Sequence, residues 1–300
     1  MPQYLNRRTF IQTAGVTAAG LVMSGTKSIA DLMPDQPLFK ISLGEYSLHR
    51  ALDAKKLDHL DFARVAKETY GINAIEYWST PFGGKVTQAD YLAELNKRAK
   101  DLGVRQLLIL IDNEGDLGDP DNQKRAQAVD NHKKWLEGAK TLGCHSIRVN
   151  ARSEGSYDEQ LKLAVDGLHR LTELGATYGL NVIVENHGGL SSNGKWLSAV
   201  MKQVNLPNCG TLPDFGNFGD YDRYLGTQEM MPYAKAVSAK SREFDDAGNE
   251  VQTDYHKILK IVVDAGYHEY LGIEYEGTKH TEPEGILLTK RLLERVRETL

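Results

Sequence analysis

Three acidic residues stand at the ends of three short apolar segments in the second half of the chain. Glu185, Asp214 and Glu274 each close such a segment, and each is followed within three residues by a glycine. A short continuous apolar run is typical of a buried strand. A carboxylate at the end of a buried strand is costly to desolvate unless it is paired or binds a cation. Three of them at one edge of one sheet therefore predict a shared divalent cation.

The ligand types narrow the choice of cation. Carboxylate oxygens suit Mg²⁺ and Mn²⁺, and an added imidazole widens the choice to other transition metals. His187 has the same parity as Glu185 in its strand, so both side chains are expected at the same rim. We therefore expect the site to bind one divalent metal ion, either Mn, Mg, Co or Zn.

The elements that must position these residues alternate along the chain. Apolar runs predict strands, and helical spacing of apolar residues predicts helices between them. The expected strands are 40–47, 74–79, 105–112, 146–151, 181–187, 209–215, 234–241 and 270–275. The expected helices are 57–70, 88–102, 121–142, 158–178, 194–204, a weaker 222–233, 254–265 and 284–299. Five of these helices stop at a glycine, which supplies a left-handed cap.

Eight strand–helix repeats predict a parallel sheet closed into a TIM (β/α)8 barrel of the α/β class. An open doubly wound sheet is the alternative, but no glycine-rich phosphate loop follows the first strand. Active sites of such barrels lie at the C-terminal strand ends. Glu185, Asp214 and Glu274 fall there, on the fifth, sixth and eighth strands.

The N-terminus has the pattern of an export signal. Residues 1–30 contain the pair Arg7-Arg8, a short Gly/Ala/Thr-rich apolar stretch and a small-x-small cleavage site, as in a twin-arginine signal peptide. An ordinary secretory signal or a basic tail is the alternative interpretation. We expect residues 1–30 to be removed and residues 31–300 to form one barrel domain, periplasmic or otherwise exported.

Charge and composition limit the partners. Removal of residues 1–30 takes away Arg7, Arg8 and Lys27 and no acid, which moves the formal net charge from −5 to −8. An acidic chain is a poor partner for nucleic acid. No other segment is long enough to span a membrane, so the mature form is expected to have no membrane partner. Cys144 and Cys209 adjoin strand starts and are expected to be buried free thiols.

The motifs at three strand ends carry a resemblance to a known family. They are Glu-Asn-His-Gly-Gly at 185–189, Asp-x-x-Asn at 214–217 and Ile-Glu-Tyr-Glu-Gly at 273–277. This pattern resembles the sugar phosphate isomerase/epimerase superfamily of xylose-isomerase-like barrels, from about Lys40 to the end of the chain. In its epimerases Glu, Asp, His and Glu at the ends of strands five to eight hold a divalent metal. The resemblance implies Glu185, Asp214 and Glu274 as metal ligands.

Two positions depart from the family pattern. The strand-seven motif His-x-Lys-Asp is replaced by Ser238-Ala239-Lys240-Ser241, so a serine stands where the fourth ligand is expected. Water or His187 could complete the metal shell. Asn217 stands where sugar epimerases commonly carry a substrate-binding histidine. Both departures weigh against simple ketose epimerisation.

Other polar residues end strands and are expected at the mouth of the barrel. Trp78 could stack on the apolar face of a sugar. The histidines on helices and outer loops, His59 among them, are expected to be exposed or structural. The expected substrate-binding residues are His49, Glu76, Trp78, Glu114, Arg148, His187 and Asn217.

The expected chemistry is proton abstraction next to a carbonyl. A metal polarises the carbonyl, and a carboxylate takes the α-proton to give an enediolate. Glu185 and Glu274 would exchange the proton, and Lys240 would stabilise the oxyanion. The leading interpretation is a metal-dependent isomerase or epimerase of sugars or sugar derivatives. A lyase acting on a keto-sugar or keto-glycoside, and a sugar-binding barrel without catalysis, are the alternatives. Superfamily analogy adds the expectation of a homo-oligomer.

Overall fold

The computed structural model describes residues 37–300, and the export signal expected over residues 1–30 lies outside this part. The strands are β1 (Lys40–Gly44), β2 (Ala74–Trp78), β3 (Arg105–Leu110), β4 (Ser146–Val149), β5 (Asn181–Glu185), β6 (Cys209–Leu212), β7 (Val237–Ser241) and β8 (Tyr270–Tyr275). The helices are α1 (His49–Asp53), α2 (Phe62–Tyr70), α3 (Ala89–Asp101), α4 (Asn122–Leu142), α5 (Tyr157–Tyr178), α6 (Gly194–Val204), α7 (Arg223–Met230), α8 (Tyr255–Asp264) and α9 (Glu282–Arg297).

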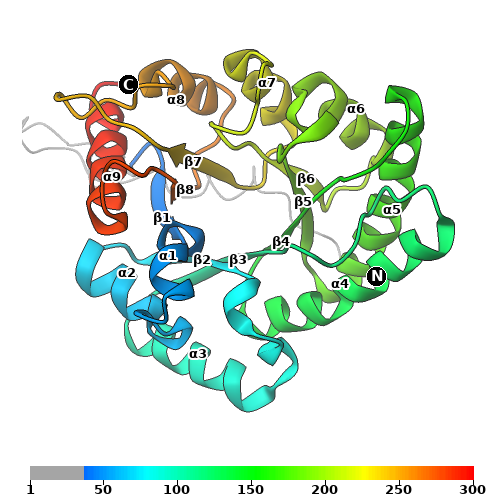
Figure 1. The fold of residues 1–300 in the computed structure, drawn as a ribbon, viewed down its shortest axis with the longest axis horizontal. Coiled ribbons are helices and arrows are strands. Elements are labelled where there is room, and N and C mark those ends of the chain that lie inside the picture. Colours follow the sequence, from blue (N-terminus) through cyan, green and yellow to red (C-terminus); the bar gives the residue numbers. More distant parts are fainter. Residues whose placement is uncertain (1–36) are drawn as a thin grey trace, which may run out of the picture. The chain divides into compact units, whose positions relative to one another are not determined.

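All eight strands are parallel and follow the order β6-β5-β4-β3-β2-β1-β8-β7. The two end strands meet through the parallel bridges Thr211–Ala234 and Asp214–Ser238. There the Ser238 amide donates to the Pro213 carbonyl at 2.9 Å. Figure 1 shows the helices arranged in a ring around the strands. The predicted TIM barrel is therefore confirmed.

The helix ends follow the capping signals in the sequence. Ser156 and Glu159 form a reciprocal capping box at the start of α5, and Gly179 ends this helix with φ of 73°. Gly71 and Gly143 end α2 and α4 in the same left-handed conformation. Glycine adopts positive φ without steric cost, so these positions stop the helices at the residues that the sequence indicates.

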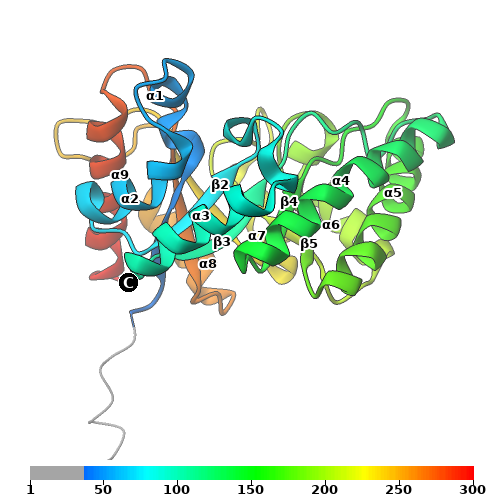
Figure 2. The same ribbon diagram turned by 90° about the horizontal axis from the view of Figure 1, so that it is seen from below.

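The main difference from the expected elements lies after β1. The strand ends at Gly44, and Glu45–Leu48 form a 3₁₀ turn that leads into the short helix α1. Figure 2 shows α1 at one rim of the barrel, beyond the bodies of α2 and α9. At this turn the Glu45 carboxylate contacts the His59 ring and accepts from the Trp78 amide.

The hydrophobic core has two parts. The larger lies between the strands and the helices, and a smaller cluster inside the barrel contains Leu108, Leu110, Ile183 and Leu212 with Ala236. Polar side chains fill much of the remaining interior.

Both cysteines are buried free thiols, as predicted. Within residues 37–300 no helix combines the length and the hydropathy that a membrane crossing needs.

Candidate active site

The structure brings together the three carboxylates at the ends of β5, β6 and β8. Oxygen atoms of Glu185, Asp214 and Glu274 lie within 4.8 Å of one another. The three residues are 1 %, 0 % and 6 % exposed, so they are desolvated and cannot be ordinary surface acids. Such mutual repulsion in a buried space is tolerated only when cations or bound protons compensate it.

Strand alternation explains how residues 89 positions apart in the sequence reach this point. Side chains of one parity face the barrel interior, so Glu185 and Glu274 follow inward-facing Ile183 and Gly272. Register pairs Lys240 of β7 with Glu274 of β8. The carboxylates therefore meet at the C-terminal ends of the strands, which is the rim that the sequence predicted.

Asp214 lies just beyond β6 and is positioned by its backbone. The Asn186 side chain donates to the Asp214 carbonyl at 2.9 Å and accepts from the Asp214 amide at 2.7 Å. Oδ1 of Asp214 accepts from the Gly216 amide at 2.8 Å. Its Oδ2 is buried without a hydrogen-bond partner among the described residues, which leaves this oxygen available to a cation.

Lys240 lies between the acids. Its Nζ is 3.0 Å from Glu274 Oε1, 3.4 Å from Asp214 Oδ2 and 3.1 Å from Glu276 Oε1. Burial disfavours the ammonium, but the carboxylates of Asp214, Glu274, Glu185 and Glu276 raise the pKa of Lys240 well above its usual value. Lys240 is therefore a fixed positive charge beside the cluster.

Both oxygens of Glu185 face donors. Asn217 Nδ2 donates to Oε1 at 2.9 Å, and Arg148 Nε lies 2.7 Å from Oε2. The Arg148 contact is an ion pair without hydrogen-bond alignment, since neither atom has a hydrogen-bond partner within residues 37–300. Burial raises the pKa of Glu185 and the Arg148 charge opposes this rise.

Asp112 anchors the other side of Arg148. Burial opposes its ionisation, but the Arg148 charge and the hydrogen bonds from Arg148 and Asn150 hold the pKa of Asp112 at about 2. Asn150 Oδ1 in turn contacts Nδ1 of His187 at 2.9 Å, and Trp78 Nε1 donates to Asp112 Oδ2 at 3.2 Å. Arg148, His187 and Trp78 thus belong to one network around the carboxylates.

Two further residues of the site were not expected from the sequence. Glu276 accepts from Lys240 and lies 3.1 Å from Nη2 of Arg242. Glu276 has the parity of Glu274, and Arg242 has the parity of Lys240. The alternation that identified the first pair could have identified the second, because both strands continue their pattern past the rim.

Two of the expected substrate-binding residues, His49 and Glu114, make their contacts with residues outside the carboxylate cluster. His49 stacks on Tyr46 with ring centroids 4.6 Å apart, and its Nδ1 lies 2.8 Å from the Tyr46 carbonyl. Glu114 accepts from Trp135 at 2.6 Å and from Lys134 at 2.9 Å, so its carboxylate ties the β3–α4 loop to α4. The structure does not bring Glu114 to the carboxylate cluster.

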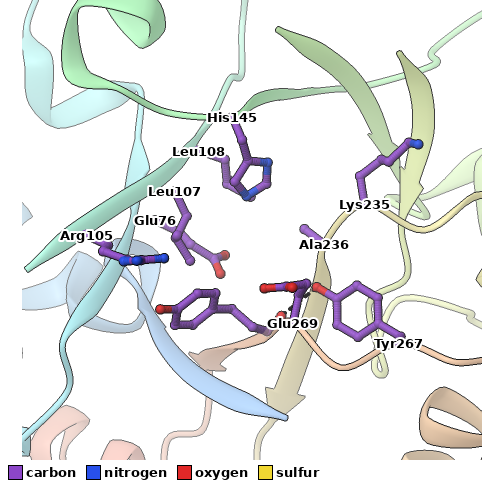
Figure 3. Close-up of a pocket in the computed structure, with 10 residues that line it drawn as sticks. Glu76, Arg105, Leu107, Leu108, His145, Lys235, Ala236, Tyr267 and Glu269 are labelled. Carbon is purple, nitrogen blue, oxygen red and sulfur yellow. Dashed lines mark hydrogen bonds between the residues drawn. The ribbon is translucent and has the colours of Figure 1, made fainter. Parts of the chain in front are cut away.

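Glu76 differs from the expectation that it faces the same rim as Trp78. It lies inside the barrel, 3 % exposed, and accepts from Ser42 at 2.6 Å. Gly272 leaves the space it needs, since a Cβ there would lie 2.5 Å from both Glu76 oxygens. Figure 3 shows the Glu76 carboxylate pointing into a cavity of about 290 Å³ among residues from the N-terminal strand ends, including Arg105 and His145.

We predict that Glu76→Gln removes part of the pH dependence of stability. Burial raises the pKa of Glu76 from 4.5 to about 7, so the folded state holds an extra proton between these values. The stabilising contribution of the Glu76 carboxyl is fully present below its pKa of 4.5 in the unfolded chain. It is lost as the pH rises through its pKa of about 7 in the folded protein. The loss is about 3 kcal/mol. Urea unfolding in the presence of chelator should therefore show Glu76→Gln more stable than the wild type at pH 8, with little difference at pH 4.5.

Glu68 is an exposed helix residue and offers the matched control. Glu68→Gln should follow the wild-type pH profile. An unchanged profile in Glu76→Gln would show that the Glu76 carboxyl has an ordinary pKa.

The charges around the cluster do not balance. Five carboxylates (Asp112, Glu185, Asp214, Glu274, Glu276) are ion-paired with three cations (Arg148, Lys240, Arg242). Formal charges leave an excess of two negative charges, which is the charge of one divalent ion. Three hard oxygen ligands fit Mg²⁺ or Mn²⁺. Ser238 donates to Glu274 Oε2 at 3.3 Å and so supports a ligand in the place where a fourth ligand was expected.

The family model for xylose isomerase-like TIM barrels matches residues 63–297. The chain belongs to this family. No curated protein matches the sequence significantly.

Solved structures share the fold at low identity. The IolI protein with a bound zinc atom has a TM-score of 0.70 and 16 % identity, covering 87 % of this chain and 99 % of that one. The 3-keto-D-glucoside 4-epimerase YcjR from E. coli has a TM-score of 0.66 and 16 % identity, covering 86 % and 99 %. The probable 3-DHS dehydratase AsbF from Bacillus anthracis has a TM-score of 0.63 and 17 % sequence identity. The match covers 85 % of this chain and 99 % of that one.

Proposed function

We propose that the protein is a divalent-metal-dependent isomerase or epimerase of a sugar or sugar derivative. The observation that carries this proposal is the convergence of three buried carboxylates within 4.8 Å beside a fixed ammonium. Epimerases of keto-sugars are among the proteins that share the fold, as the YcjR epimerase illustrates. Glu185, Asp214 and Glu274 would hold the metal, which would polarise a carbonyl and an adjacent hydroxyl of the substrate.

The residues of the chain supply the proton transfer. Glu274 is the most exposed of the three acids at 6 %, and it contacts Lys240 and Ser238. Glu185 is held by Arg148 and Asn217. One glutamate takes the α-proton and the other returns it on the opposite face of the carbon, which gives epimerisation. Return of the proton to the neighbouring carbon gives aldose–ketose isomerisation.

The positive charges stabilise the negative charge that develops on the substrate. Lys240 Nζ is held by Glu274, Asp214 and Glu276 and also donates to Asn217 Oδ1 at 3.2 Å. A preorganised charge in a buried site needs no reorganisation when the enediolate oxygen forms. Arg148 fixes the orientation of Glu185 because Asp112 holds it from the other side.

The expected result in deuterated water is incorporation of solvent deuterium at the carbon next to the substrate carbonyl. Purified protein with added Mn²⁺ would be incubated with a panel of sugars and keto-sugars and followed by NMR. Deuterium incorporation without loss of an oxygen substituent supports an isomerase or epimerase. Absence of exchange with every sugar, together with absence of bound metal after gentle purification, would contradict the proposal and support a sugar-binding barrel.

A lyase is the second candidate. The same enediolate expels a β-substituent when one is present, and the fold is shared with the AsbF dehydratase. Ser238 and Asn217, which depart from the epimerase pattern, favour it. In the same NMR experiment an unsaturated product would identify elimination.

Export through the twin-arginine route, expected from residues 1–30, and a homo-oligomeric state belong to this proposal. Cell fractionation and light scattering would test them. Recovery of unprocessed protein in the cytoplasm alone would contradict export.

A further inference from the structure

The N-terminal end of the barrel contains a cavity that takes no part in the proposed reaction. Figure 3 shows this cavity of about 290 Å³, which lies where β3, β4, β7 and β8 begin. The carboxylate cluster lies at the opposite ends of the strands. The volume is close to the lower limit of small-molecule sites, so the cavity has room for a small ligand.

The Glu76 carboxylate faces this cavity with one oxygen unpaired. Glu76 is 3 % exposed, and Figure 3 shows its carboxylate pointing into the cavity. Ser42 donates to Oε1 at 2.6 Å, and within residues 37–300 no group donates to Oε2. Burial raises the pKa of Glu76 to about 7, against the hydrogen bond from Ser42. Above that pH the carboxylate is a buried negative charge, which a cationic group in the cavity would stabilise.

The surroundings of Glu76 favour an ammonium group over a metal ion. Calcium and magnesium ions take about six or more oxygen ligands. The one other acid that lines the cavity is Glu269, and its carboxylate lies 3.2 Å from Nζ of Lys40. A single unpaired carboxylate oxygen is enough for an ammonium group, which donates to it as a charge-assisted hydrogen bond.

Two bases at the same cavity favour a negative group on the same ligand. Arg105 and Lys235 line the cavity and are exposed, so a ligand can enter from solvent beside them. Within residues 37–300 neither side chain makes an ion pair or a hydrogen bond. The guanidinium of an arginine matches the two oxygens of a carboxylate. The apolar part of the wall comes from Leu107, Leu108, Ala236, Tyr267 and Tyr270.

We propose that this cavity binds a small amino acid. The ammonium of the ligand donates to Glu76, its carboxylate accepts from Arg105, and its side chain lies against the apolar wall. This site goes beyond the proposed function and does not depend on it, because its residues lie at the other end of the barrel from Glu185, Asp214 and Glu274.

The test compares amino acids with analogues that lack one charged group. Glycine, alanine, serine and valine would be titrated by calorimetry at pH 8, where Glu76 is ionised. Each would be paired with its amine and its acid, such as isobutylamine and isovalerate for valine. Chelator prevents binding through a metal at the carboxylate cluster. At least one amino acid should bind about tenfold more tightly than either analogue, because each analogue loses one charged hydrogen bond.

Two substitutions assign the binding to this cavity. Glu76→Gln and Arg105→Gln should each weaken binding of that amino acid about tenfold or more. Glu68 on α2 and Arg152 after β4 are exposed and do not line the cavity, so Glu68→Gln and Arg152→Gln are the matched controls. Circular dichroism would verify folding, and Arg105→Gln changes only an exposed residue.

Three results would overturn the amino-acid site. If none of the four amino acids binds, the cavity holds only water. If an amine binds as tightly as its amino acid, the ligand carboxylate has no partner at the mouth. If the affinity survives Glu76→Gln or Arg105→Gln in folded protein, the amino acid binds elsewhere.

Discussion

Replacement of Glu274 by glutamine is expected to lower the rate of deuterium exchange at the substrate α-carbon by about 10²–10⁴-fold, the usual contribution of a general base. Glutamine keeps the shape of the side chain and one oxygen, so the hydrogen bond from Ser238 and the contact with Lys240 can persist. It cannot take up the proton. Because the cluster carries an excess of negative charge, loss of one charge should not unfold the protein.

Glu185→Gln is expected to abolish exchange as well, with a larger loss of stability. Its carboxylate is the partner of Arg148, and removal of one member of a buried ion pair leaves the other uncompensated. Comparison of the two variants therefore separates the acid/base role from the structural one.

Glu269 lies at the opposite end of β8 and is exposed, so Glu269→Gln is the matched control and should exchange at the wild-type rate. Rates would be measured by NMR on the substrate identified in the panel, with Mn²⁺ present. Normal exchange in Glu274→Gln or in Glu185→Gln would exclude that residue from proton transfer.

The sequence predicted the barrel because its local signals agree. Strand β8 and helix α6 begin and end at the expected residues, since an apolar run or an amphipathic repeat is bounded there by turn residues. The convergence of Glu185, Asp214 and Glu274 follows from strand parity and barrel closure, both of which are properties of regular structure. The two-residue periodicity of the strands was enough to predict that these three carboxylates lie at the same rim.

Features that depend on side-chain contacts between distant segments were not predictable in this way. The sequence could not show that Glu76 would turn toward the cavity of Figure 3, because this depends on Gly272 leaving space across the barrel. His59 was expected to be exposed or structural, and its burial against Glu45 arises only once the chain turns after β1. Glu114 was likewise expected at the mouth of the barrel, but its carboxylate accepts a hydrogen bond from Trp135 of α4.

Under the proposed function, Lys240 would contribute both to stability and to catalysis. Its ammonium is 2 % exposed and contacts Asp214, Glu274 and Glu276. A metal bound by the same carboxylates would share them with this ammonium. Loss of an oxyanion donor lowers kcat by about 10²–10³-fold, so Lys240→Met should reduce deuterium exchange to that extent.

Lys240→Met should also change the response of the protein to metal. In the presence of chelator the variant should lose about 3–5 kcal/mol of unfolding free energy, because the buried carboxylates of Asp214 and Glu274 and the half-buried Glu276 lose their cation. Excess Mn²⁺ should recover more stability in the variant than in the wild type, since a ligand that binds only the folded state stabilises it and the cluster is now more negative. Urea unfolding with and without Mn²⁺ measures both effects.

Lys260 on α8 is exposed and pairs with Asp264, so Lys260→Met should lose little stability and gain no response to metal. If Mn²⁺ stabilises neither the wild type nor Lys240→Met, the carboxylates do not form a metal site, and the negative charge that the structure concentrates at the barrel mouth must be balanced by protons.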